Sequence, residues 1–256
     1  MSVCVATVLR NCLGCLVLIT LLSACDDGVG TGKSTPTTKG ETRSAPVRGA
    51  GVIKGVVRLT GWTGKPAPVQ SVRCLGSDHD VKIEDESVVV SDKDMLRDVV
   101  VYLKDAAKSD GSNEPPAMLD QVNCRYAPHV VAVQVGQTLR VKSSDATMHN
   151  VHMAPRHNST VNVGMTGVGA RDMKFIAPER VRVRCDVHPW MNADVVVLDN
   201  PFFAVSGADG AYEITGVPTG EYTLVASHGR LGELEQTIKV DGQSPTEAAF
   251  EYKPPQ

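Results

Sequence analysis

The sequence predicts an all-β protein made of two β-sandwiches, and three features of the chain indicate this class. From residue 51 to the C-terminus, no segment keeps the periodicity of apolar residues that an amphipathic helix requires. The apolar runs are short, and they either alternate with polar residues or are apolar throughout. Turn-forming pairs that contain glycine, proline or aspartate separate these runs at short intervals, as in strands joined by tight turns.

The expected strands share a short apolar or alternating pattern. In chain order they are Val52, Gly55–Leu59, Ser87–Val90, Val99–Leu103, Val130–Val135, Leu139–Val141, Val181–Cys185, Asp194–Leu198, Ala211–Ile214, Tyr222–Ala226 and Thr237–Val240. Before Cys185, Val181 and Val183 alternate with two arginines, which predicts that the cysteine side chain faces the core. The pair Gly136-Gln137 predicts a turn between two of these strands.

The composition limits the classes of function. Of the 256 residues, 42% are hydrophobic, which suffices for one large or two modest cores and argues against a disordered chain. The formal net charge of −3 gives no basic excess of the kind that binds nucleic acid, so we expect no partner of that class. The seven cysteines are an odd number, so an exported chain keeps at least one of them outside any internal disulfide.

Residues 1–24 are expected to form a signal peptide. The run Cys12–Ala24 is apolar or small, shorter than a membrane-spanning helix of roughly 20 residues, and suited to the core of a signal sequence. Residues 22–25 (LSAC) resemble the bacterial lipobox, which implies cleavage before Cys25 and acylation of that cysteine. An ordinary cleavage site before Cys25 is the alternative.

Residues 25–50 are rich in glycine, serine, threonine, proline and lysine, which predicts a flexible tether. The lipid and the tether together predict a protein anchored on the periplasmic side of a bacterial cell envelope. Asp26 and Asp27 follow the lipidated cysteine, and this acidic pair is similar to an inner-membrane retention signal of enteric bacteria. The expectation therefore leans toward the inner membrane.

Residues 205–224 (VSGADGAYEITGVPTGEYTL) resemble part of a carboxypeptidase regulatory-like, transthyretin-like β-sandwich. The resemblance covers approximately residues 201–252, and Asp209-Gly210 and Val217-Pro218 supply tight turns between its strands. Modules of this type are structural or interaction domains. No catalytic constellation is visible in this part of the sequence.

The run from Cys185 to Met191 (CDVHPWM) contains the candidate metal-binding side chains. It spaces a thiolate, an imidazole and a thioether as C-x2-H-x2-M, at the end of one expected strand and just before another. These soft nitrogen and sulfur donors favour copper. A trigonal copper site needs a second imidazole, and His149 stands upstream in a turn that leads into a strand, followed by Asn150 and Val151.

Together these elements resemble the type 1 copper site of the cupredoxins, with amicyanin most similar and plastocyanin next. The resemblance implies a Greek-key β-sandwich and one copper ion that cycles between Cu(I) and Cu(II). It implies three equatorial ligands and a weak axial one: His149 Nδ1, Cys185 Sγ, His188 Nδ1 and, on the axis, Met191 Sδ. It also implies that Asn150 ties the two ligand segments together and that Pro189 stiffens the loop and removes one N–H near the sulfur.

Other interpretations of these residues stay open. Cys185 could be a buried free cysteine near unrelated surface residues. A zinc site is disfavoured because methionine is a poor zinc ligand and no fourth cysteine or histidine falls in register. His152 and His157 could form a second metal site with His149, but alternation along a strand turns His152 away from His149, so we expect none.

Cys4, Cys12 and Cys15 leave with the expected signal peptide, Cys25 carries lipid and Cys185 binds copper, so two cysteines remain, Cys74 and Cys124. In an oxidising compartment we expect a disulfide between them. Two buried, reduced thiols are the alternative.

These resemblances divide the chain into four expected parts, with a boundary near Asn200. They are a signal peptide at 1–24, a tether at 25–50, a cupredoxin-like copper domain with an N-terminal elaboration at 51–200, and the second β-sandwich at 201–256. Residues 120–149 are similar to bacterial plastocyanin-like proteins that carry a carboxypeptidase regulatory-like domain. Residues 51–104 fit no minimal cupredoxin, so they either elaborate the copper domain or share strands with the second sandwich.

The expected function is that of a membrane-tethered type 1 copper protein that carries single electrons and is not an enzyme. Its expected partners are a c-type cytochrome or an envelope oxidoreductase, met transiently. One alternative is a periplasmic copper-binding or copper-delivery protein without an electron-transfer role. Another is an adhesive or polysaccharide-binding module with a vestigial copper site. A multicopper oxidase is disfavoured because the chain lacks the His-x-His pairs of a trinuclear cluster.

Overall fold

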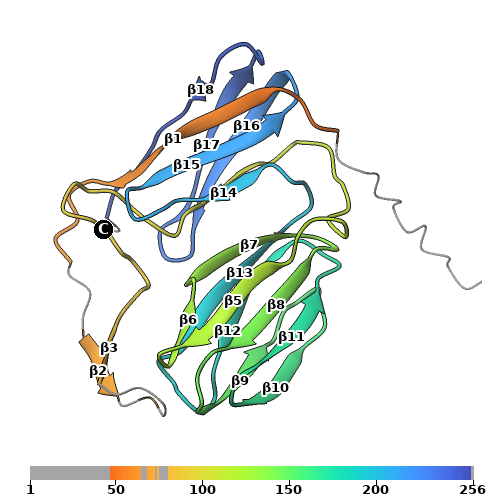
Figure 1. The fold of residues 1–256 in the computed structure, drawn as a ribbon. Coiled ribbons are helices and arrows are strands. Elements are labelled where there is room, and N and C mark those ends of the chain that lie inside the picture. Colours follow the sequence, from red (N-terminus) through yellow and green to blue (C-terminus); the bar gives the residue numbers. More distant parts are fainter. Residues whose placement is uncertain (1–46, 65–67, 73, 75–79, 255–256) are drawn as a thin grey trace, which may run out of the picture. The chain divides into compact units, whose positions relative to one another are not determined.

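The computed structural model describes residues 47–64, 68–72, 74 and 80–254, and the regular elements in this part of the chain are β-strands (Figure 1). The predicted all-β class is therefore confirmed. No helix capable of crossing a membrane occurs among these residues. The expected signal peptide, the lipidated Cys25 and nearly all of the expected tether lie outside them.

The strands carry the labels of Figure 1. Their bounds are β1 Gly51–Leu59, β2 Pro68–Val72, β3 Val81–Glu84, β4 Val100–Leu103, β5 Ala117–Val122, β6 Arg125–Ala127, β7 Val130–Gln134, β8 Thr138–Ser143, β9 Met148–Met153 and β10 Val161–Thr166. They continue with β11 Gly169–Lys174, β12 Glu179–Arg184, β13 Asn192–Leu198, β14 Phe203–Val205, β15 Ala211–Val217, β16 Gly220–His228, β17 Gly232–Val240, β18 Thr246–Glu247 and β19 Phe250–Tyr252.

Two sheets enclose the first core (Figure 1). One has five strands in the order β10-β9-β12-β13-β7, and the other has four in the order β11-β8-β5-β6. Buried apolar side chains of both sheets form a cluster that includes Cys185 and Met191. Val181 and Val183 of β12 are buried and the arginines that alternate with them are not, so the predicted alternation before Cys185 is confirmed.

A second pair of sheets surrounds a separate core. One sheet has the order β15-β1-β18, with β19 also paired to β1, and the other has the order β14-β4-β16-β17. Their core contains fully or almost fully buried apolar residues such as Ile53, Leu103, Ile214 and Leu224. β2 and β3 form a small antiparallel sheet of their own.

The strand pairing differs from the expected boundary at residue 200. β1 runs antiparallel to β15 and parallel to β18 and β19, and β4 pairs with both β14 and β16. Each of these two early strands has neighbours on both sides, so both lie inside the sheets of the C-terminal sandwich. β1 and β4 thus complete that sandwich, whereas Cys74 and Val81, from the same stretch of sequence, pack against the first core.

The predicted strand at Ser87–Val90 is also absent. Val90 alone has a bridge partner there, Leu96. The apolar pattern of the segment has a different cause, because Val88 and Val90 are partly buried against the second core. The apolar run therefore reflects packing against this core and not membership of a sheet.

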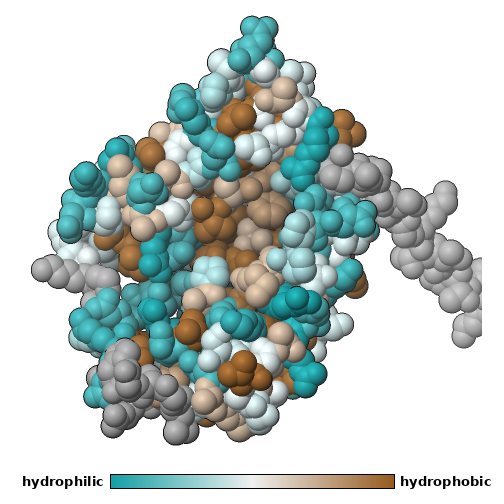
Figure 2. Space-filling view, viewed as in Figure 1, coloured by the Kyte–Doolittle hydropathy of each residue, from teal (hydrophilic) through white to brown (hydrophobic). Residues whose placement is uncertain are grey.

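A third apolar cluster joins the two sandwiches, with Val100 of β4 packed among Val130 of β7 and Leu198 of β13. Beside it lies a hollow of about 630 Å³, whose lining includes Pro128 and Phe203. Figure 2 shows apolar side chains gathered in this hollow between β7 and β14.

Replacing Ile53 with alanine is expected to destabilise the protein by about 2–5 kcal/mol, the usual cost of emptying a buried aliphatic site. The Ile53 side chain is completely buried in the second core, on the strand that has partners on both sides. Denaturant unfolding of the full chain measures the loss. Lys54→Ala on the same strand is the matched control, because the Lys54 side chain is 43% exposed and its ion pair with Glu247 is a surface pair. A similar loss in both variants would contradict the placement of β1.

Candidate metal centre

The loop between β12 and β13 places three of the expected ligands within seven residues. Cys185 follows β12 directly, and its backbone N–H donates to the carbonyl of Met191 at 3.1 Å. The N–H of Met191 in turn donates to the carbonyl of His188 at 2.9 Å. These two hydrogen bonds close the loop into a compact turn whose ends are held by paired strands.

His149 reaches this loop from β9, which pairs antiparallel with β12. The registered pairs are Val183 with Met153 and Arg184 with His152, so the first residues of β9, His149 among them, lie beside the loop that follows β12. His149, Val151 and Met153 alternate along β9 with their side chains fully buried. The sequence folds this way because alternate residues of a strand share one face, and this face lies on the first core.

The structure brings the donor atoms of His149, Cys185 and His188 within 4.8 Å of one another. The two Nδ1 atoms of His149 and His188 are 3.0 Å apart, and Cys185 Sγ lies 3.7 Å from His188 Nδ1. Met191, the expected axial ligand, is buried in the same core cluster as Cys185.

These separations allow one ion to bind all three donors. Metal–imidazole and metal–thiolate bonds are roughly 2.0 Å and 2.3 Å long. Both measured separations are shorter than the sum of two such bonds, so one ion can bridge each pair. The donor set of one thiolate, two imidazoles and a nearby thioether is soft, and it suits copper better than magnesium, calcium or manganese.

The Cys185 sulfur receives more hydrogen bonds than the sequence suggested. Burial opposes ionisation of the thiol, but bonds from His149 and from the backbone N–H groups of Asn150, His188 and Val187 outweigh it, so the pKa of Cys185 lies below its usual value. Pro189 removes one possible donor, yet its neighbours supply others. The thiolate, which is the form that binds metal, therefore forms more readily here than at an ordinary cysteine.

The pKa values of the two imidazoles are shifted in opposite directions. Burial favours the neutral ring of His149, but hydrogen bonds with Cys185 and Asp145 outweigh it and raise its pKa. Burial and the nearby charge of His149 lower the pKa of His188. A proton held between the donors is displaced when a cation takes its place, so occupation by a metal and protonation compete at this site.

Asn150 joins the two ligand segments directly. Its Oδ1 accepts the backbone N–H of Asp186 at 2.6 Å, and its Nδ2 donates to the carboxylate of Asp186 at 3.0 Å. Nδ2 also donates to Asn162 Oδ1 at 2.8 Å. The residue after His149 thus holds the residue after Cys185, as the resemblance implied.

His152 points away from the three donors. Its Nδ1 lies 2.8 Å from the Asp186 carboxylate, and Arg184 Nε lies 3.4 Å from the same ring nitrogen. Among the residues that the structure describes, neither His152 nor His157 belongs to a group of three metal-binding side chains.

The predicted disulfide between Cys74 and Cys124 is present, and the two cysteines are 50 residues apart in the sequence. Cys185 is the free cysteine of the described part of the chain, and it is buried. This free cysteine lies at the candidate metal centre.

Asp145 is the site residue that the sequence reasoning missed. Its carboxylate is buried and lies 2.8 Å from His149 Nε2, on the side of the ring opposite the other donors. Metal-binding histidines commonly donate their second N–H to a carboxylate or a carbonyl, which fixes the orientation of the ring. An acid four residues before a candidate ligand, in the turn that leads to it, was the available signal.

No protein-family model and no curated protein matches this chain. Among solved structures, a mutant of amicyanin in its Cu(I) form is similar at 19% identity and a TM-score of 0.31, with 38% of this chain and 98% of that chain covered. The purple cupredoxin of Nitrosopumilus maritimus is similar at 18% identity and a TM-score of 0.28, with 32% and 99% covered.

A copper-containing nitrite reductase of Thermus scotoductus SA-01 is also similar, at 17% identity and a TM-score of 0.31. The match takes in 33% of this chain and spans only 22% of the reductase. Because the identities and TM-scores are this low, these likenesses carry no conclusion about what the chain binds.

Proposed function

We propose that the chain is a type 1 copper protein that carries single electrons while tethered by a lipid at Cys25 to a membrane of a bacterial cell envelope. One observation carries the copper assignment. A buried thiolate and two imidazoles, from segments far apart in the sequence, converge within 4.8 Å. Donors of this kind and number are the equatorial set of blue-copper electron-transfer sites.

His149, Cys185 and His188 would hold the ion, with Met191 as a weak fourth ligand. Copper would supply a one-electron couple between Cu(I) and Cu(II). The contribution of the chain is rigidity, because the loop is closed by its own hydrogen bonds and tied to β9 through Asn150. Ligands that move little between the two oxidation states favour fast electron exchange.

The surface near the site suits brief encounters with a redox partner. His188 is partly exposed, and the side chains of Val187 and Met148, which neighbour ligands in the sequence, are 47% and 51% exposed. A small apolar surface of this kind supports weak and transient docking. We propose a c-type cytochrome or an envelope oxidoreductase as the partner, with the electron passing through the exposed edge of His188.

Voltammetry of the copper-loaded full chain, with a Cu(I) chelator present, distinguishes electron transfer from copper delivery. A carrier of electrons is expected to cycle reversibly and to keep its copper through repeated cycles. A delivery protein would lose Cu(I) to the chelator and with it the signal, and that result would contradict the proposal. Met118→Ala is the control, because Met118 is a half-exposed methionine on β5 that belongs to neither the ligand loop nor the donor cluster, and the response should not change.

A further inference from the structure

The turn between β5 and β6 has an unusual backbone. Asn123 and Cys124 both have positive φ angles, of 55° and 53°. Non-glycine residues rarely adopt this conformation, and asparagine tolerates it better than cysteine does. Two successive residues of this kind form the tight primed turn of a hairpin, and here they need support from their surroundings.

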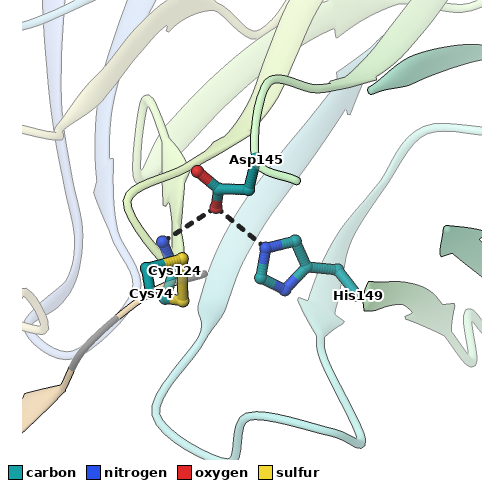
Figure 3. Close-up of side chains that lie close together, drawn as sticks. All are labelled: Cys74, Cys124, Asp145 and His149. Carbon is teal, nitrogen blue, oxygen red and sulfur yellow. Dashed lines mark hydrogen bonds and ion pairs between the residues drawn. A yellow bond between two sulfur atoms is a disulfide. The ribbon is translucent and has the colours of Figure 1, made fainter. Parts of the chain in front are cut away.

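The Asp145 carboxylate provides that support. Oδ1 accepts the backbone N–H of Asn123 at 2.8 Å, and Oδ2 accepts the N–H of Cys124 at 2.9 Å. Oδ2 also lies 2.8 Å from Nε2 of His149 (Figure 3). Consecutive backbone N–H groups that converge on one carboxylate form an anion-binding nest. One buried carboxylate therefore connects this turn to a candidate copper ligand.

The disulfide completes this arrangement. Cys124 of the turn is bonded to Cys74, and both sulfurs lie within 4.8 Å of an Asp145 oxygen and a His149 ring nitrogen (Figure 3). The carbonyl of Cys124 also accepts the indole N–H of Trp190 at 3.0 Å. The Trp190 ring packs against His188, with 5.2 Å between ring centroids. The backbone of Cys124 thus supports both imidazoles, one through Asp145 and the other through Trp190.

We propose that the Cys74–Cys124 disulfide and Asp145 act as one positioning unit of the metal centre. The disulfide holds the 123–124 turn in its strained conformation, the turn holds the carboxylate, and the carboxylate orients His149 so that Nδ1 faces Cys185 and His188. This inference rests on the proposed copper function for its metal readout. The role of the disulfide goes beyond closing a chain loop, because its loss releases the group that orients a ligand.

Copper affinity of the full chain tests the unit. Asp145→Asn and the double variant Cys74→Ala/Cys124→Ala are each expected to weaken copper binding about 10- to 100-fold, the usual effect of losing a partner of a metal-binding histidine. The triple variant is expected to lose no more copper affinity than the weaker-binding of these two variants. The reason is that both changes disrupt the same set of contacts, so their effects do not add. Alanines are used in place of reduction because free thiols would themselves bind copper.

A folded double variant with the affinity of the unmodified chain would overturn the proposal. So would a triple variant whose loss equals the product of the two separate losses. Ile53→Ala is the control for general destabilisation, because it lies in the other core, and its copper affinity should stay unchanged.

Nitrogen NMR of the metal-free protein separates this proposal from the copper function. In the intact chain, the chemical shift of His149 Nε2 is expected to reflect its hydrogen bond with Asp145. This chemical shift should change in both Asp145→Asn and the double variant. If the chain binds no copper, the proposed function fails while this measurement still tests the unit. If the double variant does not fold, the same signal is followed in the single variant Cys74→Ala. An unshifted His149 signal in a folded variant without the disulfide would contradict the unit.

Discussion

Replacing Cys185 with serine is expected to abolish the intense visible absorption of the copper-loaded protein together with its reversible one-electron response. The sulfur of Cys185 is the sole thiolate among the donors that the structure brings together at the ligand loop, since Cys74 and Cys124 are bonded to each other. A serine hydroxyl is a hard donor that does not ionise at neutral pH, so it cannot replace the soft, covalent bond of copper to a thiolate. Absorption spectroscopy of the copper-titrated variant measures the loss.

Val187→Ser is the matched control for that experiment. It introduces the same side chain into the same loop, at a residue that is half exposed and lies outside the donor cluster. We expect this variant to keep its colour and its redox response. If the Cys185 variant remained as intensely coloured as the control, another group would be the copper ligand.

Replacing Asp194 with alanine is expected to cost about 3 kcal/mol of stability, because it leaves the partly buried guanidinium group of Arg180 without its carboxylate. The Asp194 side chain is 7% exposed and contacts Arg180 at 3.1 Å and Arg182 at 3.2 Å. Arg180 also donates to the carbonyl and the hydroxyl of Ser227 on β16. The carboxylate therefore holds an arginine that connects β12 to a strand of the other sandwich. Urea unfolding of the full chain measures the loss.

Asp172→Ala provides the comparison for this ion pair. Asp172 makes two bonds of 2.7 Å to Arg140, but both side chains are nearly half exposed. Pairs in such surroundings contribute about 0–1 kcal/mol, because water screens them and holding two long side chains costs entropy. Equal losses in the two variants would show that Asp194 is not the buried partner described here.

Local sequence patterns were sufficient for the parts of the site that depend on local structure. Alternating valines predicted the buried face that carries Cys185, and ligand spacing predicted that His188 and Met191 share its loop. The structure agrees because a strand sets the direction of each side chain from its neighbours alone. The loop is short, so residues that share it remain close in the fold.

Pairing between distant strands could not be predicted in the same way. β1 lies beside β15 and β19, which are separated from it by well over half of the described chain. The apolar residues of a strand do not indicate which distant strand it pairs with. The polar strand β11 could not be predicted for a different reason. Five of its six residues are exposed, so it shows no apolar pattern, although it pairs with β8 along its whole length.

Asp145 was missed because its role depends on three separate segments. A single aspartate in a polar turn is ordinary, and turn formation alone accounts for its presence. Only the fold shows that the N–H groups of Asn123 and Cys124 meet its carboxylate while His149 meets the same group. The disulfide partner Cys74 comes from yet another segment, so the full arrangement has no signature in local sequence.

Copper titration of the full chain, followed by visible absorption and electron paramagnetic resonance, tests the central claim most directly. The geometry of His149, Cys185 and His188 predicts one bound Cu(II) per chain, an intense thiolate-to-copper absorption band, and loss of that band on reduction. A protein that binds a full equivalent of copper and stays colourless would contradict the claim, and so would one that binds no copper at this site.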